Sequence, residues 1–320
     1  MSKPKVLVTR RIPQAAFERV QAACEVRHWD SDEAIPRATL LEWIQGMDGL
    51  YCLITERIDA EVLDAAGDTL RVVSTMSVGY DHIDIAACKA RGIAIGNTPG
   101  VLTETTAELA LALLLATARR LPEAIDAVKQ GEWSAWKPEW MVGRDVFGST
   151  VGVVGLGRIG AAFARRLTGF NCRILYTASQ PKPEIGAPLK AEFTDLDTLL
   201  AESDFVSLHC PLNEATRHLV NADFLRKMKP TAMLINTTRG PVVDQAALYQ
   251  ALSTGVIAAA GLDVTTPEPL PPDHPLLTLP NCVVLPHIGS ASIATRTKMA
   301  LMAADNLIAG VSSQLLPNAV

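Results

Sequence analysis

Three polar side chains in the second half of the chain have types that suit proton transfer to a carbonyl group. Arg239, Glu268 and His287 each follow a short apolar run that is typical of a buried strand. Arginine can hold a carboxylate or polarise a carbonyl through its fork of N–H donors. A histidine beside a carboxylate is favoured in its charged form and can donate a proton to a carbonyl oxygen while a hydride arrives at the carbon.

Each of these residues also has a simpler interpretation when it is taken alone. Arg239 could form a surface ion pair, Glu268 could be a solvated loop carboxylate, and His287 could be structural. Parallel strands place their carboxyl ends at one edge of a sheet, where ligands bind in open α/β folds. Three such residues, each after a strand, therefore predict one catalytic site.

A glycine-rich segment predicts the site for a dinucleotide beside them. Gly155, Gly157 and Gly160 form a Gly-x-Gly-x-x-Gly motif between a strand pattern and a helical pattern. The first glycine permits a tight turn, the second lets a pyrophosphate approach the backbone, and the third lets helix and strand pack closely. Arg158 and Ile159 lie at the helix start, whose N–H groups face the phosphates.

The residues after the next strand predict which cofactor is preferred. Folds that prefer NAD place an Asp or Glu there for the ribose 2′-hydroxyl, whereas this chain has Ser179, Gln180 and Lys182. Ser179 can hydrogen-bond a 2′-phosphate and Lys182 can pair with its charge. We therefore expect NADPH to be preferred, with some use of NADH.

The elements that must position these residues alternate between strand and helix patterns along the chain. This alternation predicts the α/β class, with two doubly wound parallel-sheet domains, of which the second is a dinucleotide-binding (Rossmann) domain. The expected strands are 5–9, 24–29, 49–54, 71–75 and 92–96, then 151–154, 173–177, 205–209, 232–236, 258–263 and 282–285.

Two segments outside this alternation point to a partner or a lid. The pattern over 103–120 predicts a helix that is apolar on most sides, and such a helix must be buried in its own domain or against another subunit. Three tryptophans within 133–140 predict a loop that caps a site or packs on that helix.

Composition limits the other functions. The chain has 320 residues, a net charge of −5 and no long basic run, so nucleic acid and anionic membranes are not expected partners. The apolar run 109–118 is too short to span a bilayer. The six cysteines form no C-x-x-C pair and no metal-ligand cluster, so we expect reduced thiols, no bound metal and a cytoplasmic protein.

These motifs resemble the D-isomer-specific 2-hydroxyacid dehydrogenases, and among them the glyoxylate/hydroxypyruvate reductases. The resemblance covers nearly the whole chain and rests on the motifs 78–84, 155–160, 236–240, 261–270 and 286–290. It implies a small substrate-binding, flavodoxin-like domain built from 1–98 and 288–320, a cofactor domain at 99–287, an active-site cleft between them, and a homodimer.

The resemblance also implies a role for individual residues. His287 would be the general acid/base, Glu268 its charge partner, and Arg239 the residue that binds the substrate carboxylate and keto oxygen. The substrate would also contact the N–H groups of Val78 and Gly79, together with Leu53, Ser290 and, from a partner subunit, Trp136. The cofactor would contact Asp263 through its nicotinamide amide and would pass Thr106, Pro211 and Thr237.

Several activities fit the same motifs. The leading expectation is reduction of glyoxylate or hydroxypyruvate, with a small 2-keto or 2-hydroxy acid as the only partner besides the cofactor and a second subunit. The alternatives are another small 2-keto acid, phosphite, or a cofactor-sensing corepressor. Formate dehydrogenases carry Gln where Glu268 stands, which argues against formate.

Overall fold

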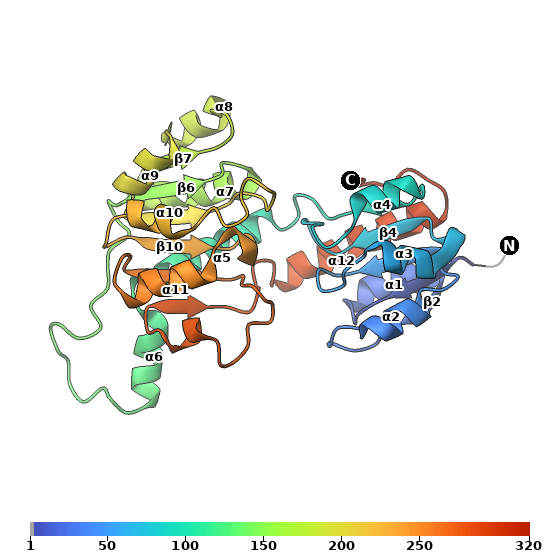
Figure 1. The fold of residues 1–320 in the computed structure, drawn as a ribbon, viewed down its shortest axis with the longest axis horizontal. Helices are drawn as coiled ribbons and strands as arrows, with labels where there is room; N and C mark the ends of the chain where they lie inside the picture. The colour runs from blue at the N-terminus through green and yellow to red at the C-terminus, as the bar shows by residue number, and fades with distance from the viewer. Residues whose placement is uncertain (1–2) are drawn as a thin grey trace. The chain divides into compact units, whose positions relative to one another are not determined.

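The computed structural model describes residues 3–320. They form two compact units, each built around its own parallel sheet (Figure 1). Unit 1 comprises the described residues up to Leu102 together with Ala291–Val320, and unit 2 comprises Thr103–Ser290. The predicted α/β class with two parallel-sheet domains is confirmed.

Unit 1 has a five-stranded sheet in the order β2-β1-β3-β4-β5, with every pair parallel, which is the flavodoxin-like order. Its strands are β1 (Lys5–Val8), β2 (Glu25–His28), β3 (Gly49–Cys52), β4 (Val72–Thr75) and β5 (Ala94–Gly96). Its helices are α1 (Gln14–Ala23), α2 (Arg37–Trp43), α3 (Ala60–Ala66), α4 (Ile85–Ala90) and α12 (Ile293–Val311).

The two faces of this sheet are covered by different helices. Val6 and Val8 of β1 pack in one cluster with residues of α1 and α12, whereas Leu7 packs in another with α2 and α3. Successive strand side chains point to opposite faces, so a strand buried on both faces is apolar throughout. The C-terminal helix α12 thereby belongs to the same unit as the N-terminal strands.

Unit 2 has a seven-stranded parallel sheet in the order β12-β11-β10-β9-β6-β7-β8. The strand order reverses between β6 and β9, and ligands bind beside such a reversal in doubly wound sheets. The strands are β6 (Thr150–Val154), β7 (Arg173–Thr177), β8 (Ala191–Phe193), β9 (Phe205–Leu208), β10 (Met233–Asn236), β11 (Ala259–Leu262) and β12 (Cys282–Val284).

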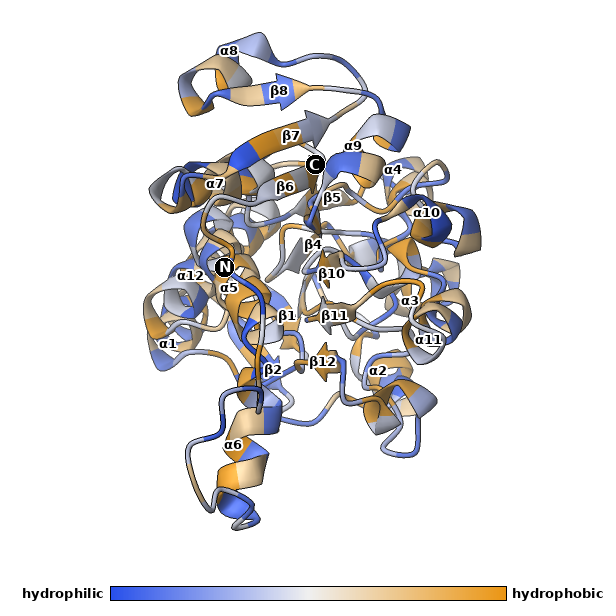
Figure 2. Ribbon diagram, turned by 90° about the vertical axis from the view of Figure 1, so that its left-hand side faces the viewer, coloured by the Kyte–Doolittle hydropathy of each residue, from blue (hydrophilic) through white to orange (hydrophobic). Residues whose placement is uncertain are grey.

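The helices of unit 2 also divide between the two faces of its sheet. Helices α5 (Thr103–Ala118) and α7 (Arg158–Leu167) bury one face, and the short helices α9 (Leu196–Glu202), α10 (Ala222–Lys227) and α11 (Gln245–Ser253) bury the other. Asp195, Asn221 and Asp244 accept backbone N–H bonds at the starts of the last three. Colouring by hydropathy shows hydrophilic and hydrophobic residues together on helices such as α7 and α11 (Figure 2).

The helix predicted over 103–120 was too long by two residues, and burial of all its sides within this chain is not seen. Helix α5 ends at Ala118, and Arg120 has a left-handed φ of 54° before a second helix, α6 (Leu121–Lys129), begins. Ala112 is exposed and Leu109 is only half-buried, so part of α5 is not covered by other residues of the chain.

Three further elements were not predicted, namely α4, α8 (Pro183–Gly186) and β8. Each has too few residues to show a periodic pattern of apolar residues.

No helix among the described residues is long and apolar enough to cross a membrane.

Candidate functional site

The glycine-rich turn connects β6 to α7 as the motif predicted. Gly155 has a φ of +101°, a conformation that side chains rarely adopt. A Cβ on Gly160 would lie 2.1 Å from the carbonyl oxygen of Gly155, so only glycine lets the helix pass this close to the turn. At Gly157, which precedes Arg158 and Ile159 at the start of α7, a Cβ would meet nothing within 4 Å.

These features fit a dinucleotide. The open space at Gly157 leaves the backbone accessible to a pyrophosphate at a helix N-terminus. Thr237 lies after β10 at the same edge of the sheet, and its buried hydroxyl has no hydrogen-bond partner among the described residues. An unpaired buried hydroxyl is costly, which is consistent with a position completed by a bound group.

The loop after β7 has no acidic residue until Glu184. Ser179 and Gln180 are exposed, and the backbone N–H of Lys182 donates to the hydroxyl of Tyr176 at 2.9 Å. Tyr176 is fully buried, so this hydrogen bond anchors the loop to the core of unit 2. The loop therefore presents hydroxyl, amide and ammonium groups where NAD-preferring folds present a carboxylate.

His287 and Glu268 form a direct pair in unit 2. The Nδ1 atom of His287 lies 2.8 Å from Oε2 of Glu268, and the other carboxylate oxygen accepts the N–H of Thr265 at 2.9 Å. Burial raises the pKa of the Glu268 carboxyl, but the hydrogen bond and charge of His287 outweigh burial, so this pKa lies below its ordinary value. Glu268 is therefore a carboxylate at neutral pH and accepts a hydrogen bond from the imidazole of His287.

Asp263 holds the backbone that carries His287. Its two carboxylate oxygens accept the N–H groups of Ile288 and Gly289, each at 2.8 Å, and its carbonyl accepts the N–H of His287 at 2.9 Å. Burial raises the pKa of Asp263 more than these bonds lower it. Each carboxylate oxygen keeps a further lone pair, so the expected bond to a nicotinamide amide remains available.

Arg239 is set by a side-chain turn that sequence reasoning missed. The side chain of Asn236, at the end of β10, accepts the N–H of Thr238 at 3.0 Å and donates to the carbonyl of Arg239 at 3.1 Å. One terminal nitrogen of Arg239 donates to the carbonyl of Thr238 at 2.9 Å. An asparagine followed by such a turn is a recognisable local signal, so Asn236 could have been found from sequence.

A second histidine, His209, follows β9 at the same edge of the sheet. Its Nε2 lies 2.9 Å from the hydroxyl of Ser207, and its ring centroid lies 4.8 Å from that of Phe163. Burial lowers the pKa of His209 to about 3, so this imidazole is neutral near pH 7 and cannot act as an acid. Of the two histidines at this edge, only His287 has a carboxylate partner.

The remaining residues predicted for unit 2 have varied surroundings. Thr106 is buried and donates to the carbonyl of Gly289 at 3.1 Å, next to Ser290, which is half-buried. Pro211 is exposed after β9. Trp136 is 83% exposed, so it does not pack on α5, and within this chain it joins none of these contacts.

The residues predicted to bind substrate in the first part of the chain lie in unit 1. Val78 and Gly79 are half-buried in the loop after β4, and Leu53 lies in the loop after β3. The N–H of Leu53 donates to the buried carboxylate of Glu56 at 2.7 Å, and the same carboxylate accepts from Thr9 and Arg10. The structure thus holds Leu53 through a buried charge that the sequence motifs did not reveal.

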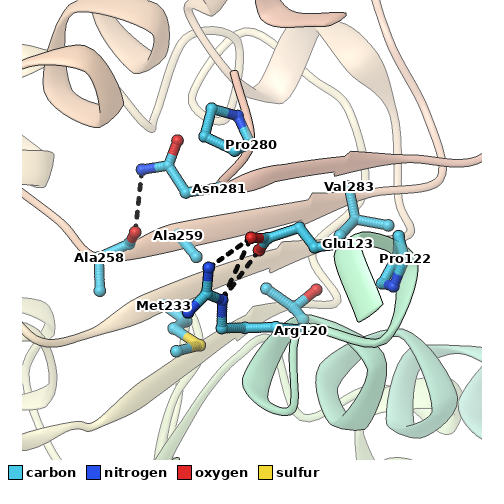
Figure 3. Close-up of a pocket in the computed structure, with 10 residues that line it drawn as sticks. Arg120, Pro122, Glu123, Met233, Ala258, Ala259, Pro280, Asn281 and Val283 are labelled. Carbon is cyan, nitrogen blue, oxygen red and sulfur yellow. Dashed lines mark hydrogen bonds and ion pairs between the residues drawn. The ribbon is translucent and has the colours of Figure 1, made fainter. Parts of the chain in front are cut away.

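A pocket of about 240 Å³ in unit 2 lies away from these residues (Figure 3). Met233 and Ala259 line it from the amino ends of β10 and β11, whereas Arg239 and His287 follow the carboxyl ends of strands. Arg120 and Glu123 also line it and form an ion pair with each other at 2.6 Å. This pocket is therefore separate from the candidate site.

Within residues 3–320, no three His, Cys, Asp or Glu side chains are grouped to hold a metal ion.

Known proteins match this chain along its length. A family model described as D-isomer specific 2-hydroxyacid dehydrogenase, NAD binding domain, matches residues 111–289. A glyoxylate reductase/hydroxypyruvate reductase of Homo sapiens is 56% identical over 318 residues, which cover 98% of this chain and 97% of that protein. This chain belongs to the D-isomer specific 2-hydroxyacid dehydrogenases. The resemblance inferred from its motifs is confirmed.

Solved structures of related proteins share the fold of this dehydrogenase. A crystal structure of a protein from Thermus thermophilus has a TM-score of 0.93 at 48% identity and covers 99% of both chains. A Sinorhizobium meliloti NADPH-dependent glyoxylate/hydroxypyruvate reductase, in complex with NADP and malonate, has a TM-score of 0.86 at 36% identity and covers 100% of this chain and 97% of its own. The matched NAD binding domain of the dehydrogenase falls within unit 2.

Proposed function

We propose that this dehydrogenase reduces glyoxylate and hydroxypyruvate to the corresponding 2-hydroxy acids, glycolate and D-glycerate, with NADPH as the preferred cofactor. The observation that carries the proposal is the His287–Glu268 pair at 2.8 Å, in the same unit as a glycine-rich dinucleotide turn and in a member of this family. The choice of substrate is supported by the names of relatives that are 56% and 52% identical to this chain, a glyoxylate reductase/hydroxypyruvate reductase and a glyoxylate reductase.

In the proposed reaction, the residues of this chain either transfer a proton to the substrate or bind its charged group. The bound nicotinamide supplies a hydride to the carbonyl carbon. Glu268 holds Nδ1 of His287, so the proton passes to the carbonyl oxygen from Nε2. Arg239 binds the substrate carboxylate and keto oxygen through its fork of donors, with Val78 and Gly79 of unit 1 adding backbone N–H groups. Ser290 and Leu53 contact the substrate.

The test is an assay of NADPH oxidation with glyoxylate, hydroxypyruvate, pyruvate and phenylpyruvate, repeated with NADH. We expect high turnover on the first two substrates with NADPH. Turnover confined to phenylpyruvate would contradict the proposed substrate while keeping the roles of His287 and Arg239. Absence of turnover on all four would contradict the proposed function and favour phosphite or a corepressor role.

The preference for NADPH rests on the loop after β7. None of the residues 3–320 forms an ion pair with Lys182, so its ammonium group is available for a 2′-phosphate. Ser179 and Gln180 are exposed beside it and can donate hydrogen bonds to the same phosphate. The remaining cofactor contacts come from the glycine turn, Thr106, Pro211, Thr237 and Asp263.

Ser179→Asp should therefore reverse the cofactor preference. The new carboxylate repels a 2′-phosphate and can accept the 2′-hydroxyl of NADH, so the NADPH/NADH ratio of kcat/KM should fall by about 10- to 100-fold. Ser253→Asp adds the same charge at an exposed position of unit 2 and should leave the ratio unchanged. If Ser179→Asp also leaves it unchanged, this loop does not select the cofactor.

A homodimer is the second part of the proposal. Seven large apolar side chains within 121–147 are exposed, including Ile125 at 53%, Val128 at 56% and Trp136 at 83%. Helix α6 and the following loop project from unit 2 beyond the β12 edge of its sheet in both views (Figures 1 and 2). An apolar surface of this kind marks a protein interface, and a second copy would cover it and bring Trp136 to the partner's substrate. The six free thiols suit a cytoplasmic enzyme.

The double substitution Ile125→Asp, Val128→Asp should convert a dimer to a monomer, because it places two charges in the apolar contact. The mass in solution can be measured by light scattering after size-exclusion chromatography. Leu315→Asp is the control, since Leu315 is 96% exposed but belongs to unit 1, and the dimer should persist. A dimer that survives the double substitution would exclude α6 from the interface.

A further inference from the structure

Three successive peptide carbonyls in the loop after β4 are held by hydrogen bonds from within unit 1. The carbonyl of Ser77 accepts the N–H of Thr98 at 2.9 Å, and the carbonyl of Val78 accepts Nδ2 of Asn97 at 2.9 Å. The carbonyl of Gly79 accepts the hydroxyl of Ser77 at 2.6 Å. All three peptide planes are thereby fixed in orientation.

The N–H groups of the same peptides must point the other way. In a planar trans peptide, the carbonyl and the N–H of the next residue are antiparallel. Fixing the carbonyls of Ser77 and Val78 therefore directs the N–H groups of Val78 and Gly79 away from Asn97 and Thr98. Across residues 3–320, no hydrogen bond uses either of these N–H groups, and both residues are half-exposed. Successive unpaired N–H groups of this kind form an anion site.

We infer that Asn97 is a positioning residue whose side-chain amide aims the N–H of Gly79 at the substrate carboxylate. The inference rests on the proposed function, which assigns that N–H to the carboxylate. Thr98 orients the N–H of Val78 in the same way, but it does so with its backbone N–H, which a substitution does not remove. Asn97 uses its side chain, so a substitution there can test the orientation of the loop. Asn97 does not need to touch the substrate to do this.

Asn97 is itself held firmly enough for this role. It is 8% exposed, its carbonyl accepts Nδ2 of the fully buried Asn306 at 2.9 Å, and its N–H donates to the carbonyl of Asn318 at 3.1 Å. Asn306 lies in the C-terminal half of α12, and its side chain also accepts the N–H of Asn318 at 3.0 Å. The asparagine that orients the loop after β4 is thus fixed by the C-terminal part of unit 1.

Asn97→Asp tests the inference because it keeps the side-chain shape and replaces the donor with an acceptor. An acceptor facing the carbonyl of Val78 is unfavourable, so the peptide will rotate and the N–H of Gly79 will turn from the carboxylate. We expect the ratio of kcat/KM for glyoxylate to kcat/KM for ethyl glyoxylate to fall by about 10- to 100-fold, the worth of one hydrogen bond to a charged group. The ester lacks the charged carboxylate and serves as the internal reference.

A second readout does not need turnover. The Kd of oxalate for the NADPH-bound enzyme, measured by calorimetry, should rise by a similar factor, while the Kd of NADPH stays unchanged because its site lies in unit 2. Asn97→Ala should show the same direction with a smaller change, since water can replace the lost amide, and it covers the case in which Asn97→Asp does not fold.

The matched control is Asn281→Ala. Asn281 also donates from its side-chain amide to backbone carbonyls, those of Leu252 and Ala258, but in unit 2 and away from the loop. A fall in thermal stability of both variants, with the acid-to-ester ratio and the oxalate Kd altered only at position 97, supports the inference. An unchanged ratio and oxalate Kd in folded Asn97→Asp and Asn97→Ala would overturn it.

Failure of the proposed function would look different. If the unmodified enzyme reduces neither glyoxylate nor hydroxypyruvate, the proposed substrate is wrong. The oxalate measurement still decides the role of Asn97, because it reports carboxylate binding whichever keto acid is reduced.

Discussion

Replacing His287 with asparagine should lower kcat for keto-acid reduction by about 10²- to 10⁴-fold, the usual contribution of a positioned general acid. His287 is the histidine at the carboxyl edge of the unit 2 sheet that pairs with a carboxylate, Glu268, at 2.8 Å. Asparagine cannot supply a proton at neutral pH. The loss should therefore appear in the chemical step and leave the Kd of NADPH unchanged.

Asparagine suits this test because His287 has a φ of 54°, a left-handed conformation that asparagine tolerates better than alanine. His218 has a φ of 52° and is exposed in the same unit, so His218→Asn applies the same change at a matched backbone position. That control should retain full activity. Loss of NADPH binding in His287→Asn would instead indicate a structural role for His287.

The charge partner should show a smaller effect. Glu268→Gln keeps a hydrogen-bonding side chain beside His287 but removes the negative charge that lies 2.8 Å from Nδ1. We expect kcat to fall by about 10-fold or more while the Kd of NADPH stays unchanged, because Glu268 acts through His287. Full activity in this variant would mean that the negative charge of Glu268 is not needed beside His287.

The second large effect is expected at Arg239. Arg239→Ala should raise the KM for glyoxylate by roughly 30- to 1,000-fold, because removing one partner of a hydrogen-bonded charge pair costs about 2–4 kcal/mol. Arg239→Lys should recover only part of this loss, since lysine keeps the charge but not the planar fork of donors. Steady-state kinetics at saturating NADPH would measure both.

Arg226→Ala is the matched control for this arginine. Arg226 pairs with Asp223 at the exposed surface of unit 2, and such pairs contribute little to stability. KM should therefore stay unchanged in this variant. A KM for Arg239→Ala equal to that of the unmodified enzyme would remove Arg239 from the substrate site.

Local patterns in the sequence were sufficient to predict the architecture, which the structure confirms, and to propose the main site residues. Apolar runs of strand length alternate with helical periods, and glycines at 155, 157 and 160 are required wherever a chain turns this tightly under a pyrophosphate. Arg239, Glu268 and His287 were predicted as site residues because each follows a strand at the edge where ligands bind. These signals depend on neighbours within a few residues, so they can be read without the fold.

Only the tertiary structure shows which distant residues hold the predicted site residues. Asp263 bonds Ile288 and Gly289 from 25 and 26 residues away, Asn97 bonds Val78 from 19 residues away, and Asn306 bonds Asn97 from 209 residues away. The periodicity of apolar residues carries no information about such pairs, because the two partners of each pair meet only after distant segments have packed together within their unit. The sequence by itself therefore predicted which groups would do the chemistry, and the packing of distant segments decided how those groups are held.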